Sequence, residues 1–293
     1  MVFTHLFKLK ILFKSIWRSN CLNTKLSNFT QKKTMKFNSL LFYLILATAL
    51  TACSPTSNSA SFNAKPEAVL KNFSTWWAYH SQNINLSKDY TSLNASLNAI
   101  DHELFLQMLA TGNYVAFQLN TPDLSYKYAL YELSSNANNE IRTQVIQFAE
   151  DGYRKFKMEG TKIPDFNFTD LNGKIYNKEN TKGKIVVLKC WFVNCLKCVE
   201  EMPALNEVVK EFNTRDDVVF ISLAFDSKEK LVKFLSNTNF DYAVIPVTRN
   251  YLEEQLKVTE YPTHFILNKK GRITKVVTDY HDMVYALKFE LLQ

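Results

Sequence analysis

The stretch IVVLKCWFVNCLKC, residues 185–198, decides how the second half of this chain folds. Its first eight residues are mostly β-branched, aromatic or otherwise apolar, which is typical of a strand buried on both faces. Two cysteines, Cys195 and Cys198, follow at once, where the pattern changes to that of a helix ending near Phe212. The stretch therefore predicts a buried strand over 185–192 and a helix that begins at Cys195.

This position of the two cysteines favours thiol chemistry. A thiol at the start of a helix faces unpaired backbone N–H groups and the positive end of the helix dipole, and both stabilise the thiolate. The thiolate is the form that attacks a disulfide. Because residues i and i+3 share one face of a helix, Cys198 lies within reach of a disulfide formed at Cys195. The spacing indicates that Cys195 attacks and Cys198 resolves.

The segments around this stretch alternate between strand and helix patterns. An Asn172-Gly173 pair between apolar residues predicts a hairpin just before the buried strand. The alternation predicts an α/β fold with three layers, whose last hairpin gives the sheet an antiparallel edge. The later segments are expected strands over 218–225, 243–247, 263–267 and 273–277, helices over 227–235 and 252–256, a turn over 269–271 and a last helix from about His281.

The segment 66–157 is rich in aromatic and amide side chains and predicts a smaller α+β accessory region. Trp76 and Trp77 within it have two interpretations. They form a binding surface or, as is more common for aromatic residues at helical spacing, they belong to a core. The elements expected here are helices over 67–79 and 140–156 and two short strands over 114–119 and 126–133.

Five short blocks, in order along the chain, resemble the thioredoxin-fold thiol-disulfide oxidoreductases of the periplasm, of the TlpA and ResA type. The resemblance runs from about Gly160 to the C-terminus and implies a thioredoxin-like domain over 160–293. Five ordered blocks are far more specific than an isolated C-x-x-C pair, which also fits half of a zinc site. The blocks are Pro164-Asp165-Phe166, Gly183 to Leu188, Trp191 to Cys198, Glu201-Met202-Pro203 and Tyr261-Pro262-Thr263.

The resemblance implies roles for several residues near the cysteines. Pro262 matches the proline that takes the cis form opposite the cysteine pair, and its neighbour Tyr261 offers backbone hydrogen bonds to an extended substrate. Trp191 belongs to the same substrate-positioning group. Glu201 matches a buried acid that is expected to have a raised pKa and to exchange protons with Cys198. The alternative for Glu201 is a solvated position on the helix surface.

Three features depart from the family pattern. Leu196-Lys197 separates the cysteines where a proline is common, Lys189 stands where an acid or an amide is usual, and a third cysteine, Cys190, lies in the buried strand. An inward-facing lysine needs a partner, for which Glu201 is the candidate, or its charge reaches the surface. Cys190 is expected to be a small apolar core residue and His264 a strand residue rather than a ligand.

The distribution of charge argues against a nucleic-acid partner. The chain has a formal net charge of +7, but eight of its 35 Lys and Arg residues and none of its 28 acids precede Cys53. The 27 remaining basic residues nearly balance the acids, so the excess belongs to the N-terminal leader.

That leader resembles the export signal of bacterial lipoproteins. Met35-Lys36, the apolar run 40–50 and the sequence Leu50-Thr51-Ala52-Cys53 predict a signal peptide over 35–52 and a lipid on Cys53. Residues 53–65 then form a polar tether. The segment 1–34 is interpreted as an over-extended reading frame or an unusual leader. These features predict a protein anchored in the cell envelope and facing the periplasm, with Ser54 favouring the outer membrane.

The sequence thus supports one leading function and two alternatives. The leading hypothesis is disulfide exchange with protein thiols, most simply as a reductase supplied by an upstream electron donor, with no cofactor besides the cysteine pair. No second Cys or His pair at metal-ligand spacing accompanies the first, so no metal is expected. The alternatives are a thioredoxin-like binding module with a structural disulfide and a peroxiredoxin-like thiol peroxidase, the latter disfavoured by Phe192 at the position where a peroxidatic site has threonine.

Overall fold

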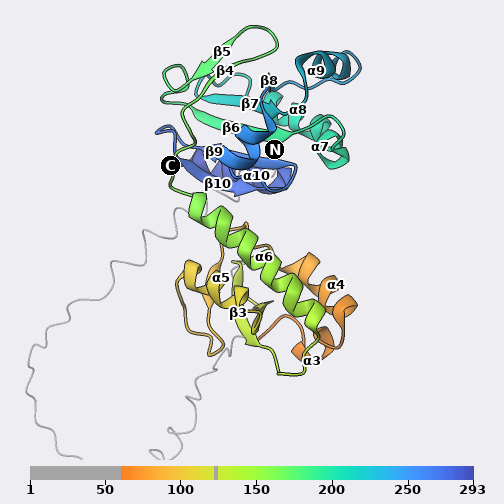
Figure 1. Cartoon of the computed structure of the whole chain (residues 1–293). Coiled ribbons are helices and arrows are strands. Elements are labelled where there is room, and N and C mark those ends of the chain that lie inside the picture. Colours follow the sequence, from red (N-terminus) through yellow and green to blue (C-terminus); the bar gives the residue numbers. More distant parts are fainter. Residues whose placement is uncertain (1–60, 122–124) are drawn as a thin grey trace, which may run out of the picture. The chain divides into compact units, whose positions relative to one another are not determined.

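The computed structural model describes residues 61–121 and 125–293, which are coloured in Figure 1. The leader and signal peptide predicted over 1–52, the lipid-bearing Cys53 and most of the tether lie outside the described residues. In the part that is described, no helix has both the length and the apolar composition needed to cross a membrane.

A mixed five-stranded sheet lies at the centre of the C-terminal part, and β6 (Ile185–Trp191) is its middle strand. The strand order is β10-β9-β6-β7-β8. β6, β7 and β8 run parallel, whereas β9 is antiparallel to β6 and β10 to β9. The predicted α/β sheet with an antiparallel edge is therefore confirmed. The outer strands are β7 (Val218–Ala224), β8 (Ala243–Pro246), β9 (Thr263–Leu267) and β10 (Ile273–Val277).

The side chains of β6 alternate between two hydrophobic cores, one on each face of the sheet. Val187 and Trp191 lie in the first core, and Leu188 lies in the second. Every residue of this strand is buried, which explains its nearly continuous apolar sequence. Because successive residues of a strand point to opposite faces, Lys189 faces the first core, which also contains Cys198.

Helices cover the face of the sheet that bears the first core. Leu205, Leu231 and Leu287 join it from α8, α9 and α10. The second core lies against the β4–β5 hairpin and a short π-helix. These elements are α8 (Met202–Glu211), α9 (Lys228–Leu235), α10 (Tyr280–Glu290), β4 (Asn167–Thr169), β5 (Ile175–Asn177) and the π-helix Tyr251–Gln255.

The prediction of one continuous helix from Cys195 to about Phe212 is wrong, because two helices occupy this segment. α7 (Leu196–Glu200) ends at Glu201, and α8 begins at the next residue. Pro203 lies in the first turn of α8, where its missing N–H costs no hydrogen bond. The proline therefore starts a new helix just behind the cysteines.

The segment before Gly160 has a core of its own and is α+β in content. Its sheet has the order β1-β3-β2, with β1 parallel to β3, and the sequence predicted neither β1 nor α5. Trp76 is 1% exposed and belongs to this core, whereas Trp77 is 43% exposed. The elements are α3 (Pro66–Val69), α4 (Phe73–Asn83), β1 (Thr91–Leu93), α5 (His102–Ala110), β2 (Tyr114–Gln118), β3 (Lys127–Glu132) and α6 (Asn139–Met158).

Candidate active site

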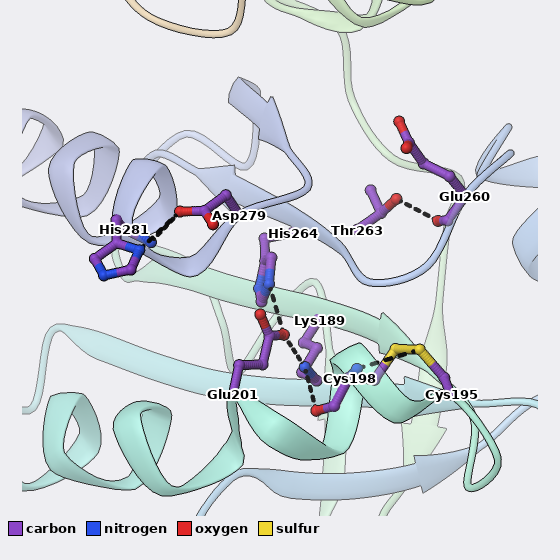
Figure 2. Close-up of polar contacts among 9 residues, drawn as sticks. All are labelled: Lys189, Cys195, Cys198, Glu201, Glu260, Thr263, His264, Asp279 and His281. Atoms are coloured by element: carbon purple, nitrogen blue, oxygen red, sulfur yellow. Dashed lines mark hydrogen bonds and ion pairs between the residues drawn. A yellow bond between two sulfur atoms is a disulfide. The ribbon is translucent and has the colours of Figure 1, made fainter. Parts of the chain in front are cut away.

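A disulfide joins Cys195 and Cys198 at the start of α7, with their Cα atoms 5.2 Å apart (Figure 2). Cys195 is the N-cap residue of this helix, and its Sγ accepts a hydrogen bond from the backbone N–H of Cys198 at 3.2 Å. Cys195 is 7% exposed and Cys198 is 0% exposed. Only the first sulfur is therefore reachable from solvent, and the backbone N–H of the second residue already points at it.

Asp226 holds the loop that connects β6 to the cysteines. Its Oδ2 accepts a hydrogen bond from the backbone N–H of Val193 at 2.7 Å, and its Oδ1 lies 2.5 Å from Nζ of Lys230. The sequence analysis missed this residue. The sequence could have indicated that Asp226 lies near the cysteine loop. Asp226 follows β7, which is parallel to β6, and the carboxyl ends of parallel strands meet at one edge of a sheet.

A buried group of ionisable residues lies on the Cys198 side of the disulfide (Figure 2). Lys189 has no exposed surface, and its Nζ donates hydrogen bonds to the backbone oxygen of Cys198, at 3.2 Å, and to Oε1 of Glu201. Glu201 is therefore the partner that the inward-facing lysine was predicted to need. The ammonium thus connects Cys198 to a carboxylate inside the protein.

His264 is the third member of this group. It lies in β9, as predicted, and the sheet register pairs it with Lys189 of β6. Its Nε2 is 3.0 Å from Oε1 of Glu201, which is close enough for an ion pair when the ring is protonated but is not aligned as a hydrogen bond. We call Lys189, Glu201 and His264 the buried ionisable cluster. The sequence analysis did not connect His264 to the cysteines.

The buried ionisable cluster reverses one expectation for Glu201. Burial by itself would raise the pKa of this carboxyl, but the contacts with His264 and Lys189 outweigh burial and hold the pKa below its ordinary value. The predicted raised pKa is therefore wrong, because the prediction did not include two basic neighbours. Burial also lowers the pKa of Lys189 and of His264, and Glu201 offsets part of each shift.

The remaining predicted residues lie around the cysteine loop or beneath it. The Tyr261–Pro262 peptide bond is cis, and the ring of Tyr261 contacts that of Phe192 with centroids 5.4 Å apart. Trp191 is fully buried and packs against Phe234, so it supports the loop from below and presents no surface to a substrate. Cys190 is free and buried, as predicted, and burial raises the pKa of its thiol.

The described residues define the class of protein. A thioredoxin-like oxidoreductase has a mixed sheet with this strand order, a C-x-x-C disulfide at the start of the helix after the central strand, and a cis-proline. Within residues 61–121 and 125–293, no group of three His, Cys, Asp or Glu side chains is arranged to hold a metal ion. The reactive group at this site is the cysteine pair itself.

Comparison with known proteins agrees with this class. The model of the AhpC/TSA family matches residues 160–276. The thioredoxin-like protein YneN of Bacillus subtilis is 32% identical over 124 residues, which cover 42% of this chain and 71% of YneN. The thiol-disulfide oxidoreductase ResA of Bacillus subtilis is 30% identical over 121 residues, which cover 41% of this chain and 67% of ResA. The chain belongs to the thioredoxin-like thiol-disulfide oxidoreductases.

Among solved structures, the pneumococcal exposed lipoprotein thioredoxin of Streptococcus pneumoniae is similar to part of this chain. It is 25% identical, with a TM-score of 0.39, and the match covers 43% of this chain and 99% of that one. The residues that the AhpC/TSA family model matches include the disulfide.

Proposed function

We propose that this protein exchanges disulfides with protein substrates outside the cytoplasm, as a reductase in which Cys195 attacks and Cys198 resolves. The observation that supports these roles is the difference in access between the two sulfurs. Cys195 retains exposed surface at the N-terminus of α7, whereas Cys198 is sealed beneath it. A substrate disulfide therefore meets Cys195 first.

The proposed reaction has two exchange steps. The Cys195 thiolate attacks one substrate sulfur, forms a mixed disulfide and releases the other substrate sulfur as a thiolate, which takes up a proton. Cys198 then loses its proton and attacks Sγ of Cys195, which releases the second substrate sulfur and restores the Cys195–Cys198 disulfide. Two electrons and two protons pass to the substrate, and a thiol donor must reduce the pair again.

Lys189 and Glu201 have proposed roles in the second step. The Lys189 ammonium is hydrogen-bonded to the backbone oxygen of Cys198, and its positive charge is proposed to favour ionisation of the thiol of that residue. Glu201 holds that ammonium in place and is a positioning residue rather than a proton donor. The backbone of Tyr261 next to the cis-proline is proposed to bind an extended substrate, as the family resemblance implies.

The proposed location is the cell envelope, facing the periplasm. Its support is the sequence pattern that ends at Cys53, which fits a lipid-bearing cysteine after a signal peptide. Mass spectrometry of the mature protein tests the location, because a lipid on residue 53 adds its mass to the N-terminal peptide. Recovery of an unprocessed chain from the cytoplasm would contradict it.

Trapping tests the chemistry directly. Cys198→Ala is expected to accumulate mixed disulfides on Cys195, and Cys195→Ala is expected to abolish reduction of a protein disulfide. Cys190→Ala is the matched control, because that thiol is buried in the opposite core and should leave exchange intact. The substrate attached to Cys195 is then identified by mass spectrometry.

The same preparations separate the alternatives. If Cys195 and Cys198 form their disulfide but exchange it with no substrate, a binding module with a structural disulfide is favoured. Consumption of hydroperoxide that depends on Cys195 would favour a thiol peroxidase. Either result would replace the proposed reductase function.

A further inference from the structure

A second concave site lies at the end of β6 opposite to the cysteines. It is a pocket of about 490 Å³ formed by the segments 162–166, 178–184 and 269–271, with Val186 and Leu267 between them. β6 begins beside this pocket, and its seven residues span about 20 Å before the cysteine loop. A molecule bound here would therefore not contact the disulfide.

Basic side chains dominate the rim of this pocket, which we call the lysine pocket. Two of its lysines have acidic partners, Lys178 with Asp165 at 3.6 Å and Lys269 with Asp217 at 2.8 Å. The other four form no ion pair with any described residue, so their charges are uncompensated. The six lysines are Lys162, Lys178, Lys182, Lys184, Lys269 and Lys270, and the only acids that line the pocket are Asp165 and Glu179.

This concentration of charge is unusual within this protein. From Cys53 onward the chain has 27 basic and 28 acidic residues, so its net charge is close to zero. The lysine pocket nevertheless contains six lysines and two acids. The potential in a concave site of one sign attracts anions more strongly than separate surface charges do.

The floor of the lysine pocket is apolar. Its accessible apolar surface belongs to Ile163, Pro164 and Phe166, which are partly exposed, whereas Val186 and Leu267 are buried in the second core of the sheet. A small inorganic anion would leave this apolar surface in contact with water. An occupant with an apolar body covers it and gains the free energy of burying that surface.

Backbone hydrogen bonds hold the walls of the lysine pocket in place. The N–H of Gly183, at φ +78°, donates to the carbonyl of Lys269 at 3.1 Å and joins the two loops. Oδ1 of Asn268 accepts from the N–H groups of Lys270 and Arg272, both at 3.0 Å. The site is therefore formed before a ligand arrives, which lowers the entropy cost of binding.

We propose that the lysine pocket binds an amphiphilic anion, a molecule with an apolar body and a carboxylate or phosphate group. The apolar body lies on the floor, and the anionic group meets the uncompensated lysines at the rim. The volume and the apolar floor are of the kind found in small-ligand sites. The same chemistry is offered by a free amphiphile and by a lipid of an anionic bilayer.

Calorimetry of the full chain with decanoate tests this proposal. Decanoate is expected to bind at one site with an affinity that falls as salt is added, because screening weakens the attraction between charges. Decanol, which lacks the charge, and acetate, which lacks the apolar body, are expected to bind much more weakly. Equal binding of decanol and decanoate, or no binding of decanoate, would overturn the proposal.

A matched pair of charge reversals assigns the binding to this pocket. Lys182→Glu/Lys270→Glu is expected to weaken decanoate binding by about tenfold or more, since two attractions become repulsions. Lys228→Glu/Lys233→Glu changes the same charge on α9, at exposed positions away from the pocket, and is expected to bind like the wild type. Equal affinities of the two double variants would refute the assignment.

Vesicles distinguish the two sources of ligand. If the natural ligand is a lipid, the pocket variant will bind phosphatidylglycerol vesicles less than the control variant does, and neither will differ on phosphatidylcholine. If only decanoate binding falls, the ligand is a free amphiphile. All of these measurements are independent of disulfide exchange, so they succeed or fail separately from the proposed reductase function.

Discussion

Lys189 is the residue whose environment is least expected from its type. A lysine is rarely fully buried unless it is paired, and this one lies beneath the disulfide with Glu201 and the Cys198 carbonyl as its partners. Where the resembling proteins place an acid or an amide, this chain places a cation. A cation favours the thiolate of a neighbouring cysteine, whereas an acid opposes it.

Replacing Lys189 tests whether its positive charge favours the thiolate of Cys198. Lys189→Met removes the positive charge beside Cys198, so the pKa of that thiol should rise in the reduced protein. The release of a trapped mixed disulfide from Cys195 should slow about tenfold near neutral pH, with its pH profile displaced to higher pH. Stopped-flow fluorescence of the release step measures both quantities.

A double variant separates the chemical role from the structural one. Lys189→Met leaves the Glu201 carboxylate buried without its cation, which should lower the free energy of unfolding by about 3 kcal/mol. Adding Glu201→Gln removes the unpaired charge and should recover much of this stability without restoring the rate. A purely structural lysine would instead give a Lys189→Met variant whose pH profile overlays that of the wild type.

At the scale of elements, the ends of helices and strands decide where the reactive groups lie. β6 ends at Trp191, Asp226 holds the following loop from the end of β7, and α7 begins directly after Cys195. α8 then begins at Met202, one residue after Glu201, with Pro203 in its first turn. The acid therefore stands at the junction of two helices, where its side chain turns inward toward Lys189.

The contact between α4 and α6 contains a histidine that should respond to pH. The ring of His80 lies 4.9 Å from the rings of both Trp76 and Phe148, and burial lowers its pKa to about 4. The unfolded chain, with an ordinary pKa near 6.5, therefore binds a proton first as the pH falls. The stability contributed by the neutral ring is complete above about pH 6.5 and is lost as the pH falls toward 4.

Urea unfolding at several pH values measures this dependence. Between pH 7 and pH 4, the wild type is expected to lose about 1–2 kcal/mol more than His80→Phe, which keeps the ring contacts and cannot be protonated. The expected loss is smaller than the full pKa shift implies, because the edge of the ring retains some exposed surface. Parallel stability curves for the two proteins would contradict the prediction.

At the scale of the whole molecule, the long helix α6 contacts the segment that leads into the cis-proline. Nζ of Lys155 lies 2.6 Å from carboxylate oxygens of both Asp151 and Glu260. Arg154 donates a hydrogen bond to Oγ1 of Thr259 at 2.6 Å. The last turns of α6 thus connect the accessory region to the residues just before Tyr261–Pro262.

Lys155→Met tests how much this contact contributes to the stability of the fold. The variant removes a cation that is 11% exposed from between two partly exposed carboxylates, so solvent screens the lost attraction, and the free energy of unfolding in urea should fall by about 1 kcal/mol. Lys157→Met on the same helix is the control, because Lys157 is exposed and paired only at the surface. If both variants have the wild-type stability, the contact does not stabilise the fold.

The central part of the fold was predictable from local signals. The apolar run over 185–192 predicted β6, the Asn172-Gly173 pair predicted the β4–β5 hairpin, and the C-x-x-C spacing predicted the disulfide that the structure contains. These features depend on neighbours within a few residues, so the sequence contains all the information needed to predict them. The sequence alone also predicted that Lys189, if it faced inward, would need a partner, with Glu201 as the candidate.

Only the tertiary structure decided the electrostatics of the site and the position of the lysine pocket. Glu201 and His264 are far apart in the chain and meet because β9 pairs with β6 in one particular register. Their contact lowers the pKa of Glu201, the opposite of what burial alone predicts. The lysines of the pocket likewise come from three separate segments. Periodicity and spacing describe one segment at a time, whereas Coulomb interactions and burial depend on distances that exist only after the segments have packed together.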